Sequence, residues 1–525
     1  MSTLSARAES LRLFLRAYKP VVVLLLAVLG GVIGGLLATS PLLALASIVL
    51  LVVSITVLSW PEAATLLVIF ILYSNIAVVL VRFHGVPFIA GAAFPLLLAL
   101  PLAIYLVLER RPLRITPALP YVVLFMAAQQ VSLLFSNDPA ASFREVTNFV
   151  LEGFLIYLLV INVVRTPRTL RHVAWTLLLA GIVLTAAPFY QQITGSFDDT
   201  LGGFGQLSEV GFRTGETNLV EGDLRQYRLS GPIGEQNRYA QVLLMLVPLG
   251  WFALYFERSL GLKLLGLALA GVALGGVALS FSRGAAVAFV ILVLAMLVTR
   301  LLRPAHFLVF LLLVAVVLMA VPQLTVRLVT IPSVTDLLSE ETTTSELDGA
   351  IRGRATAMIA AALVFADHPI VGVGPGQFQF YSAEYGNRLG IRILEGNREA
   401  HSLFLDVAAN YGILGLISFL AMVLVPIRVI LAARHKLAGR RPALSYLTIG
   451  FAFAILAYLG TGIFLHLSYV RYFWLMLGLA DTAALIAQRA ANEEPIVRAY
   501  AATAGLNARD YAGEWLPGET AGGSQ

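Results

Sequence analysis

Residues 400–415 read AHSLFLDVAANYGILG, which leads from the longest polar segment of the chain into an apolar run. At about 100° per residue, a helix here would present His401, Leu405, Ala408, Gly412 and Gly415 on one face. Mostly small residues on such a face let a neighbouring helix approach closely. The stretch therefore predicts a membrane helix with His401 at its start. The alternative for a lone histidine is a satisfied side chain at the membrane interface.

Composition sets the class of protein. The chain has 525 residues, of which 59% are hydrophobic and 13% charged, whereas soluble domains have roughly 45–50% apolar and about 25% charged residues. We therefore predict an all-α polytopic membrane protein with about 12–14 transmembrane helices. Apolar runs of about 17–25 residues begin near Val21, Leu42, Ala64, Phe88, Leu119, Phe149, His172, Tyr239, Leu260, Gly284, Ala305, Ser402, Ala443 and Val470.

Basic residues lie on alternate loops between these runs, as expected if the basic loops face the cytoplasm. Examples are Arg110, Arg111 and Arg114, then Arg165, Arg168 and Arg171, then Arg258 and Lys263, then Arg434, Lys436, Arg440 and Arg441. The net charge of +6 therefore indicates membrane orientation and no nucleic-acid partner. The predicted segments are a cytoplasmic N-terminus (1–19), membrane helices (20–189), an external loop (190–237), membrane helices (238–321), a large external loop with short helices (322–400), membrane helices (401–488) and a cytoplasmic tail (489–525).

Three arginines on the predicted outer face are not explained by orientation. Arg283, in SRGA, lies alone at an outer turn, and such a charge in an apolar setting usually has a partner. Arg228 lies in RLSGPIGEQN, where Asn237 is placed to cap the following helix. Arg354 begins the run ATAMIAAALVFADHP, which predicts an interfacial helix before the rigid loop VGVGPGQF. The alternatives are a snorkelling arginine for Arg283 and solvated surface charge for the others.

These residue types point to phosphate chemistry. Guanidinium stays charged and matches the geometry of phosphate oxygens, and a histidine titrating near neutrality suits deprotonation of a hydroxyl. There are no cysteines, and no pair of histidines has the spacing of a zinc helix. Together they predict transfer from a lipid-linked diphosphate without a metal or other cofactor.

The pattern His401, Ser402, Gly412, Gly415, preceded by DHPIVGVGPGQF, resembles the signature region of the O-antigen ligase and O-antigen polymerase superfamily. RLSGPIGEQN and SRGA are similar to the two other arginine-bearing segments of that family. The resemblance covers about residues 220–480. It implies a GT-C-like glycosyltransferase that takes a glycan from undecaprenyl diphosphate at the outer leaflet of the inner membrane.

The resemblance also implies roles for single residues. His401 would act as general base or position the acceptor, and Arg228, Arg283 and Arg354 would bind the diphosphate. Direct attack by an acceptor hydroxyl would invert the anomeric centre, and the acceptor would be a lipid or another glycan. Asn237, Ser402, Gly412 and Gly415 would support the site. The partners implied are the lipid-linked donor, the acceptor and membrane lipids.

Several alternatives stay open at this stage. A polymerase of the same superfamily shares the histidine and arginine chemistry with a ligase, and a protein acceptor is also compatible with it. A flippase for the lipid-linked glycan would favour charges near mid-membrane, whereas a scaffold would leave Arg283 and His401 unexplained. A metal-dependent mechanism would have to use Asp138 or the pair Asp198 and Asp199.

Overall fold

A computed structural model of the chain describes residues 60–504, except for 89–90, 92–93, 198, 206–215, 219–224, 303–307, 309–345, 390–395 and 467–469. The spans expected near Val21, Leu42 and Ala305 lie outside the described residues. So do most of the first half of the large external loop and the end of the predicted tail.

Helices account for nearly all of the regular structure described. Before the first long loop they are α4 (Pro61–Tyr73), α5 (Ile76–Phe83), η1 (Phe94–Leu98), α7 (Ala99–Ala103), η2 (Ile104–Leu108), α8 (Leu119–Leu133), α9 (Pro139–Phe149), η3 (Val150–Phe154), α10 (Leu155–Val163) and α11 (Pro167–Thr194). After it they are η4 (Leu201–Gly203), η5 (Gly231–Ile233), α12 (Gln236–Leu244), α13 (Leu246–Phe256), α14 (Leu260–Leu279), α15 (Arg283–Val298), α19 (Glu346–Asp367), α20 (Phe378–Arg388), α21 (Leu403–Leu437), α22 (Pro442–Gly462) and α23 (Val470–Ala504).

The all-α polytopic membrane fold is confirmed. Among the described residues, seven helices are long and apolar enough to cross a membrane, and α4 with α5, bent by 60°, makes an eighth if the pair is one span. Three shorter apolar helices, Phe94–Val107, Leu119–Leu133 and Arg283–Val298, coincide with further expected spans. Each expected span inside the described residues therefore corresponds to an apolar helix. The helix α23 continues past residue 489, where the tail was predicted to begin, to Ala504.

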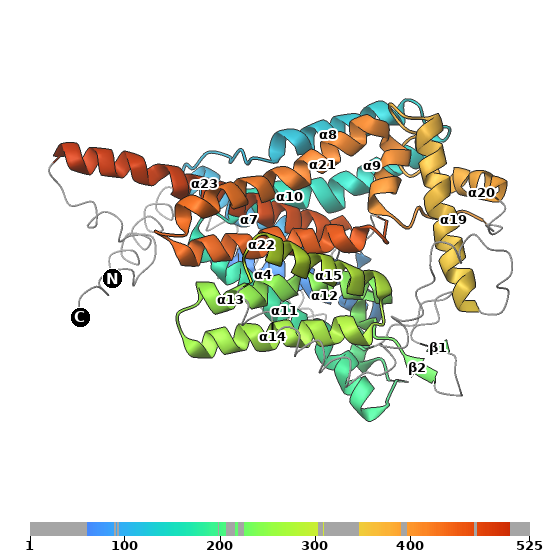
Figure 1. Ribbon diagram of the computed structural model, residues 1–525, viewed down its shortest axis with the longest axis horizontal. Coiled ribbons are helices and arrows are strands. Elements are labelled where there is room, and N and C mark those ends of the chain that lie inside the picture. The colour runs from blue at the N-terminus through green and yellow to red at the C-terminus, as the bar shows by residue number, and fades with distance from the viewer. Residues whose placement is uncertain are drawn as a thin grey trace, which may run out of the picture. The chain divides into compact units, whose positions relative to one another are not determined.

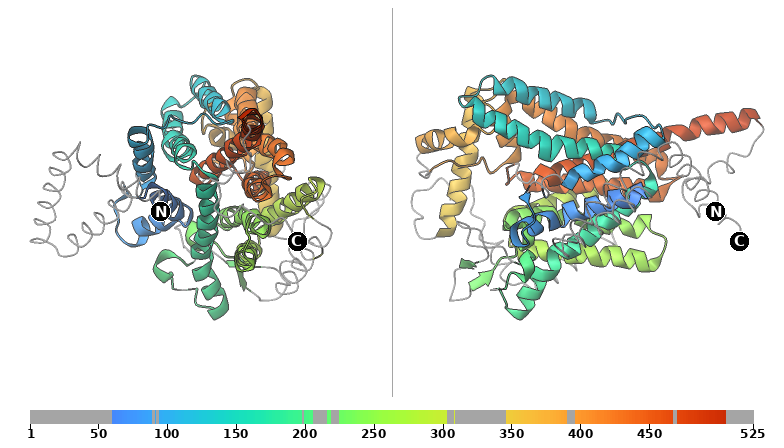
Figure 2. Two further views of the ribbon diagram at one scale, coloured as in Figure 1. Left: turned by 90° about the vertical axis from the view of Figure 1, so that its left-hand side faces the viewer. Right: turned by 180° about the vertical axis from the view of Figure 1, so that it is seen from behind.

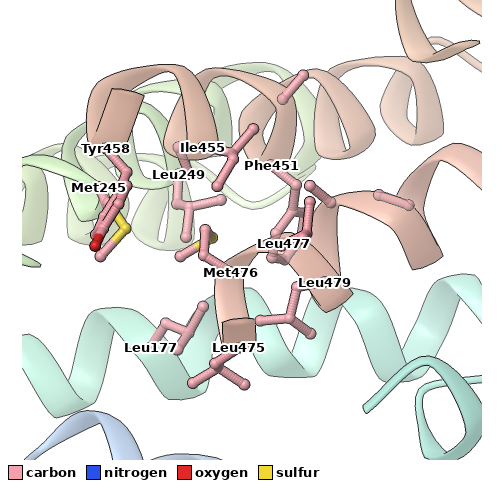
Figure 3. Close-up of a cluster of buried hydrophobic side chains, with 14 of the residues drawn as sticks. Leu177, Met245, Leu249, Phe451, Ile455, Tyr458, Leu475, Met476, Leu477 and Leu479 are labelled. Carbon is pink, nitrogen blue, oxygen red and sulfur yellow. The ribbon is translucent and has the colours of Figure 1, made fainter. Parts of the chain in front are cut away.

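The long helices pack around one apolar core. Figure 3 shows Leu177 of α11, Leu249 of α13, Ile455 of α22 and Met476 of α23 pointing toward one another, and all four are buried. Helices α13 and α14 approach so closely that a Cβ atom on Gly250 would lie 2.5 Å from the carbonyl oxygen of Gly266. In lipid no hydrophobic effect draws helices together, so they associate through close van der Waals packing. Small residues at the crossing allow that close approach.

The two ends of the helices in Figure 1 differ in the loops that they carry. The turns from α13 to α14 and from α21 to α22, which were predicted to be cytoplasmic, lie at the left. The turn from α14 to α15 and the helices α19 and α20, which were predicted to be external, lie at the right. At the left end the Arg171 guanidinium binds the Glu257 carboxylate through two contacts of 2.6 and 2.5 Å. This grouping is what the alternation of basic loops requires.

The second external loop contains a helix that crosses the ends of the spans. Figure 1 shows α19 running across the right-hand end of the long helices, and the right panel of Figure 2, seen from behind, shows the same crossing at the left. This helix is the one that was predicted to be interfacial. Its buried residues, such as Ala361 and Val364, form a small separate core with Phe378 of α20 and Ala409 of α21.

In the first external loop, two three-residue strands, β1 (Glu216–Asn218) and β2 (Arg225–Tyr227), pair antiparallel with Glu216 opposite Tyr227. No alternation of apolar and polar residues in the sequence predicted this hairpin.

Candidate active site

Two of the predicted arginine segments meet at the right-hand end of the bundle. The Leu229 amide donates to the Leu279 carbonyl at 3.0 Å, and the Arg228 Nε donates to the Ser280 carbonyl at 2.8 Å. The loop before α12 therefore lies against the turn between α14 and α15. That turn ends at Ser282, which caps α15, and Arg283 is the first residue of the helix. Segments about fifty residues apart in the sequence thus place Arg228 and Arg283 in one region.

Asn237 joins these segments, but not as the helix cap that the sequence predicted. The cap of α12 is Glu235, whose carboxylate accepts from the Asn237 and Arg238 amides at 3.0 and 2.6 Å. A carboxylate suits this place because it faces the positive end of the helix dipole. Asn237 lies in the first turn instead, and its Oδ1 accepts from the Ser282 hydroxyl at 2.8 Å. It therefore holds the Arg228 segment to the Arg283 segment.

His401 lies in the bend before α21 and not on the helix itself. Its φ of 51° is positive, a conformation that costs a non-glycine residue about 1–2 kcal/mol. Ser402, with an extended backbone, precedes the first helical residue, and its carbonyl accepts from the Asp406 amide at 2.8 Å. The His401 ring is partly buried and packs edge to face against the ring of His466, with centroids 6.1 Å apart. His401 thus lies in a strained bend before α21 and not on the helix face that was predicted for it.

The surroundings keep His401 neutral. Burial lowers its pKa to about 4, helped by the positive charges of Arg354, Arg238 and Arg398. The pKa of His466 is lowered as well, first by burial and then by Arg238 and His401. A neutral imidazole has a lone pair free to accept a proton. The sequence predicted a histidine that titrates near neutrality, whereas these surroundings shift the pKa of His401 into the acidic range.

The predicted continuous stripe below His401 is wrong, because α21 is interrupted. Gly412 has φ 63° and ψ −161° inside the helix, and a Cβ atom on it would lie 2.3 Å from the backbone of Ile370. The partner at this face is thus the loop after α19 and not a neighbouring helix. Gly415 packs against Tyr411, one turn earlier in the same helix. A Cβ atom on Gly415 would lie 2.1 Å from the Tyr411 side chain.

Backbone hydrogen bonds close the gap that this break opens in α21. The Val373 and Gly374 amides donate to the Ala409 and Asn410 carbonyls, each at 3.0 Å. On the other side of the break, the Ile413 amide donates to the Pro369 carbonyl at 2.8 Å. Buried backbone groups in a membrane protein need such partners. The loop VGVGPGQF, predicted to be rigid, is therefore fixed to α21 at the height of the candidate site.

The predicted arginine of the large external loop, Arg354, is solvent exposed on α19. After burial, its charge is the first of the influences that lower the pKa of His401. It therefore lies within electrostatic reach of the histidine, in a place open to a ligand.

Sequence reasoning missed Arg238, which follows Asn237 in α12. Its side chain is only 3% exposed, and its Nη1 donates to the Gln241 Oε1 at 3.3 Å. Gln241 in turn donates to the Thr461 hydroxyl of α22 at 2.8 Å. An arginine within an apolar span is costly and marks a functional site by default. That signal was present in the segment GEQNRYAQVLL.

Sequence reasoning also missed a cavity of about 300 Å³ between α9, η3, α20 and the start of α21. It is lined by carboxylates, amides, aromatic rings and one histidine: Glu145, Asn148, Phe149, Glu152, Gly376, Gln379, Glu399, Asp406, Val407, Asn410, Tyr411, His466 and Val470. The sequence feature that could have indicated this cavity is the presence of acidic residues inside predicted spans, as in TNFVLEGFLIY and SLFLDVAAN. We name it the acidic cavity.

The aspartates weighed for a metal-dependent mechanism have local structural roles. Asp138 caps α9 by accepting from the Ala141 amide at 3.0 Å, and Asp199 accepts from the Leu201 amide at 2.8 Å. Asp198 lies outside the described residues. Within the part of the chain that the structure describes, no three acidic or histidine side chains are grouped as metal ligands would be.

Comparison with known proteins adds one finding. The family model for O-antigen ligase matches residues 265–420 of this chain. No match was found among curated proteins. The matched range contains Arg283, Arg354, His401 and the break at Gly412, while Arg228 and Arg238 lie before it. The resemblance to the O-antigen ligase superfamily is therefore confirmed, and it rests on residues 265–420.

Proposed function

We propose that this protein is a glycosyltransferase that moves a glycan from undecaprenyl diphosphate to an acceptor hydroxyl. The match to the O-antigen ligase family supports glycosyl transfer of this kind. The observation that carries the proposal is a neutral His401 within the field of several arginines, at the end of the bundle that bears the long loops. A base beside a cluster of guanidinium groups suits a reaction with a hydroxyl acceptor and a diphosphate leaving group.

The proposed reaction is a single displacement. The acceptor oxygen forms a bond to the anomeric carbon while its proton passes to a ring nitrogen of His401. The bond from the anomeric carbon to the diphosphate oxygen breaks, and the electron pair leaves with the diphosphate. Because the acceptor attacks from the face opposite the leaving group, the anomeric configuration inverts. The products are a new glycoside and undecaprenyl diphosphate.

The arginines stabilise the departing diphosphate. Arg228 and Arg283 bind it, and Arg354 on α19 approaches from the external loop. Each hydrogen bond to a charged group contributes roughly 1.5–3 kcal/mol, and stabilisation of developing charge is usually the largest part of such catalysis. Two or three such contacts supply a large share of the barrier reduction without a metal ion.

The same charges link donor binding to the basicity of His401. In the free protein burial, and after it the charges of the nearby guanidinium groups, disfavour the imidazolium and keep the pKa of His401 at about 4. A bound diphosphate carries negative charge into this field, which favours the protonated form. His401 therefore becomes a better base once the donor is in place.

Orientation follows from the loops. The basic turns at one end of the bundle face the cytoplasm, so the end with α19, His401 and the arginines faces the periplasm. The protein would then act at the outer leaflet of the inner membrane, where the lipid-linked donor is presented. Labelling of single cysteines introduced at residues 258 and 384 with a membrane-impermeant reagent tests this orientation.

The experiment that tests the function is glycan transfer by the purified protein in liposomes. The donor is an undecaprenyl diphosphate glycan, and the acceptors are a panel of lipids and lipid-linked glycans. Transfer of the glycan to a lipid acceptor would identify a ligase, and extension of a lipid-linked glycan would identify a polymerase. Movement of the donor between leaflets without a covalent product would contradict the proposal and indicate a flippase.

Chelation should leave the reaction unchanged. Addition of EDTA to the liposomes is expected to preserve the wild-type rate, because the arginines carry the charge stabilisation. Loss of transfer that a divalent cation restores would replace the proposed mechanism with a metal-dependent one.

A further inference from the structure

The acidic cavity lies beside the candidate base. His466 lines it and packs against the ring of His401. Figure 1 shows that α9, α20 and the start of α21, which supply most of its lining, lie at the same end of the bundle as the turn from α14 to α15. The cavity is therefore a second compartment near the arginine region, by which we mean Arg228, Arg238, Arg283 and Arg354.

Its lining differs in charge from the arginine region. Among the described residues that line it, four are carboxylates, three are amides and none is lysine or arginine. A diphosphate would be disfavoured by such a lining, because like charges repel one another. The donor diphosphate therefore belongs with the arginines, and the cavity is left for another ligand.

The polar groups point to a ligand rich in hydroxyl groups. Carboxylate oxygens accept hydrogen bonds, and amides both accept and donate them. Phe149 and Tyr411 add aromatic surface to the lining, which suits the apolar face of a sugar ring. The volume of about 300 Å³ is at the lower end of the range for small-molecule sites, enough for a single sugar unit.

Two of the carboxylates lie inside a membrane span, where a charged side chain is energetically costly. Glu145, Asn148 and Glu152 follow one another at helical spacing along α9 and the π-helical turn η3, inside an apolar span. Acidic residues inside spans are rare and mark substrate pathways by default, and single π-helical turns are frequent at functional sites. These three side chains all line the cavity.

On the α21 side, Asp406 is held in position by Asn410. The Asn410 Nδ2 donates to the Asp406 Oδ1 at 3.0 Å, and its Oδ1 accepts from the Phe378 amide at 2.9 Å. Glu399 completes the lining just before His401, and its pKa is raised, first by desolvation and then by the charge of Glu145. The wall nearest to His401 is thus built on a fixed frame.

We propose that the acidic cavity binds the sugar of the acceptor and presents its hydroxyl to His401. This inference rests on the proposed function and names the place of its second substrate. Glu145, Asn148 and Glu152 form one wall and Glu399 with Asp406 the other. They act as binding and positioning residues, and the cavity selects for neutral or amino-bearing sugars over anionic ones.

The first test separates acceptor from donor in the liposome assay. Glu152→Gln keeps the shape of the side chain and removes its charge. It should raise the KM for the acceptor about tenfold, as expected for loss of a charge-assisted hydrogen bond, while kcat and the KM for the donor stay unchanged. Glu145→Gln should act in the same direction. Glu384→Gln, the same change on the exposed helix α20, is the matched control. An unchanged acceptor KM in both cavity variants overturns the proposal.

The second test does not depend on catalysis. Saturation-transfer NMR of the purified protein in nanodiscs would measure binding of methyl glycosides of neutral hexoses and 2-amino-2-deoxyhexoses. Binding should persist in His401→Ala and weaken at least tenfold in a Glu145→Gln, Glu152→Gln double variant. Absence of glycoside binding, binding that the double variant leaves intact, or competition of glycoside binding by millimolar Mg²⁺ would each overturn the proposal. Binding without transfer in the wild-type protein would instead contradict the proposed reaction alone.

Discussion

The arginine region, with Arg228, Arg238, Arg283 and Arg354, and the acidic cavity arise from the sequence in different ways. The charges of Arg354 and Arg238 act on His401, whereas the cavity is lined by His466, whose ring packs against that of His401. Arg283 begins α15 and Arg228 lies in the loop before α12, where the short motifs SRGA and RLSGPIGEQN predicted them. The carboxylates of the cavity come from α9, η3, α21 and the segment before it, and no single motif contains more than two of them. The contrast shows that a charge at the end of a span is visible in sequence, whereas a cavity assembled from several spans is not.

The largest effect is expected where the two regions meet. His401→Ala should abolish transfer, because a positioned general base contributes about 10²–10⁴-fold to rate, while membrane insertion is unchanged. His435→Ala, at the opposite end of α21, should leave the rate intact. Transfer by His401→Ala at the wild-type rate would show that the base lies elsewhere, with a cavity carboxylate as the next candidate.

Arginine variants should affect the donor and not the acceptor. Arg283→Ala is expected to lower kcat/KM for the donor by roughly 10–150-fold, which corresponds to the loss of a contact of about 1.5–3 kcal/mol. Arg228→Lys should recover only part of the function, because an ammonium group does not offer the paired donors of guanidinium. Arg388→Ala on α20 is the control. A rise in the KM for the acceptor in Arg283→Ala would contradict the assignment of the donor to the arginine region and the acceptor to the acidic cavity.

The frame that holds both regions is tested at Gly412. Gly412→Ala introduces a Cβ atom 2.3 Å from the Ile370 backbone at a residue with φ 63°. Strain at such positions costs about 1–3 kcal/mol, so the midpoint of thermal unfolding in detergent should fall and transfer should weaken for both substrates. Gly439→Ala, where nothing lies within 4 Å of the added atom, should leave the midpoint unchanged. Equal midpoints for the two variants would show that the loop does not pack against α21 as described.

The smallest effect concerns Arg238 and pH. Burial lowers the pKa of His401 to about 4, with smaller contributions from the charges of Arg354 and then Arg238. Removing that charge in Arg238→Gln makes protonation of His401 easier, so its pKa should rise toward 6.5. As pH falls, kcat/KM for the donor should therefore begin to decline at a higher pH than in the wild-type protein. If the acidic decline of kcat/KM moves to lower pH, or does not move, the Arg238 charge does not lower the pKa of His401.

The residues proposed for the site came from local features of the sequence. His401, Arg283 and Arg354 lie within the family match, and the loop between α19 and α20, predicted to be rigid from its glycines and proline, has positive φ angles at Gly372, Gly374 and Gly376. The cap of α12 was misassigned to Asn237 because two acceptable capping residues lie two positions apart. Arg238 and the acidic cavity were missed because attention to outer loops passed over ionisable residues within the spans.

The sequence alone determined that this is a helical membrane protein, where its described spans lie, and which basic loops share one end. These properties depend on hydropathy and charge within about 20 consecutive residues. Tertiary structure decided that α21 breaks at Gly412, that Asn237 joins two arginine segments, and that carboxylates from separate helices enclose one cavity. Such features depend on which backbones approach within hydrogen-bonding distance, and that is a property of packing between segments far apart in the chain.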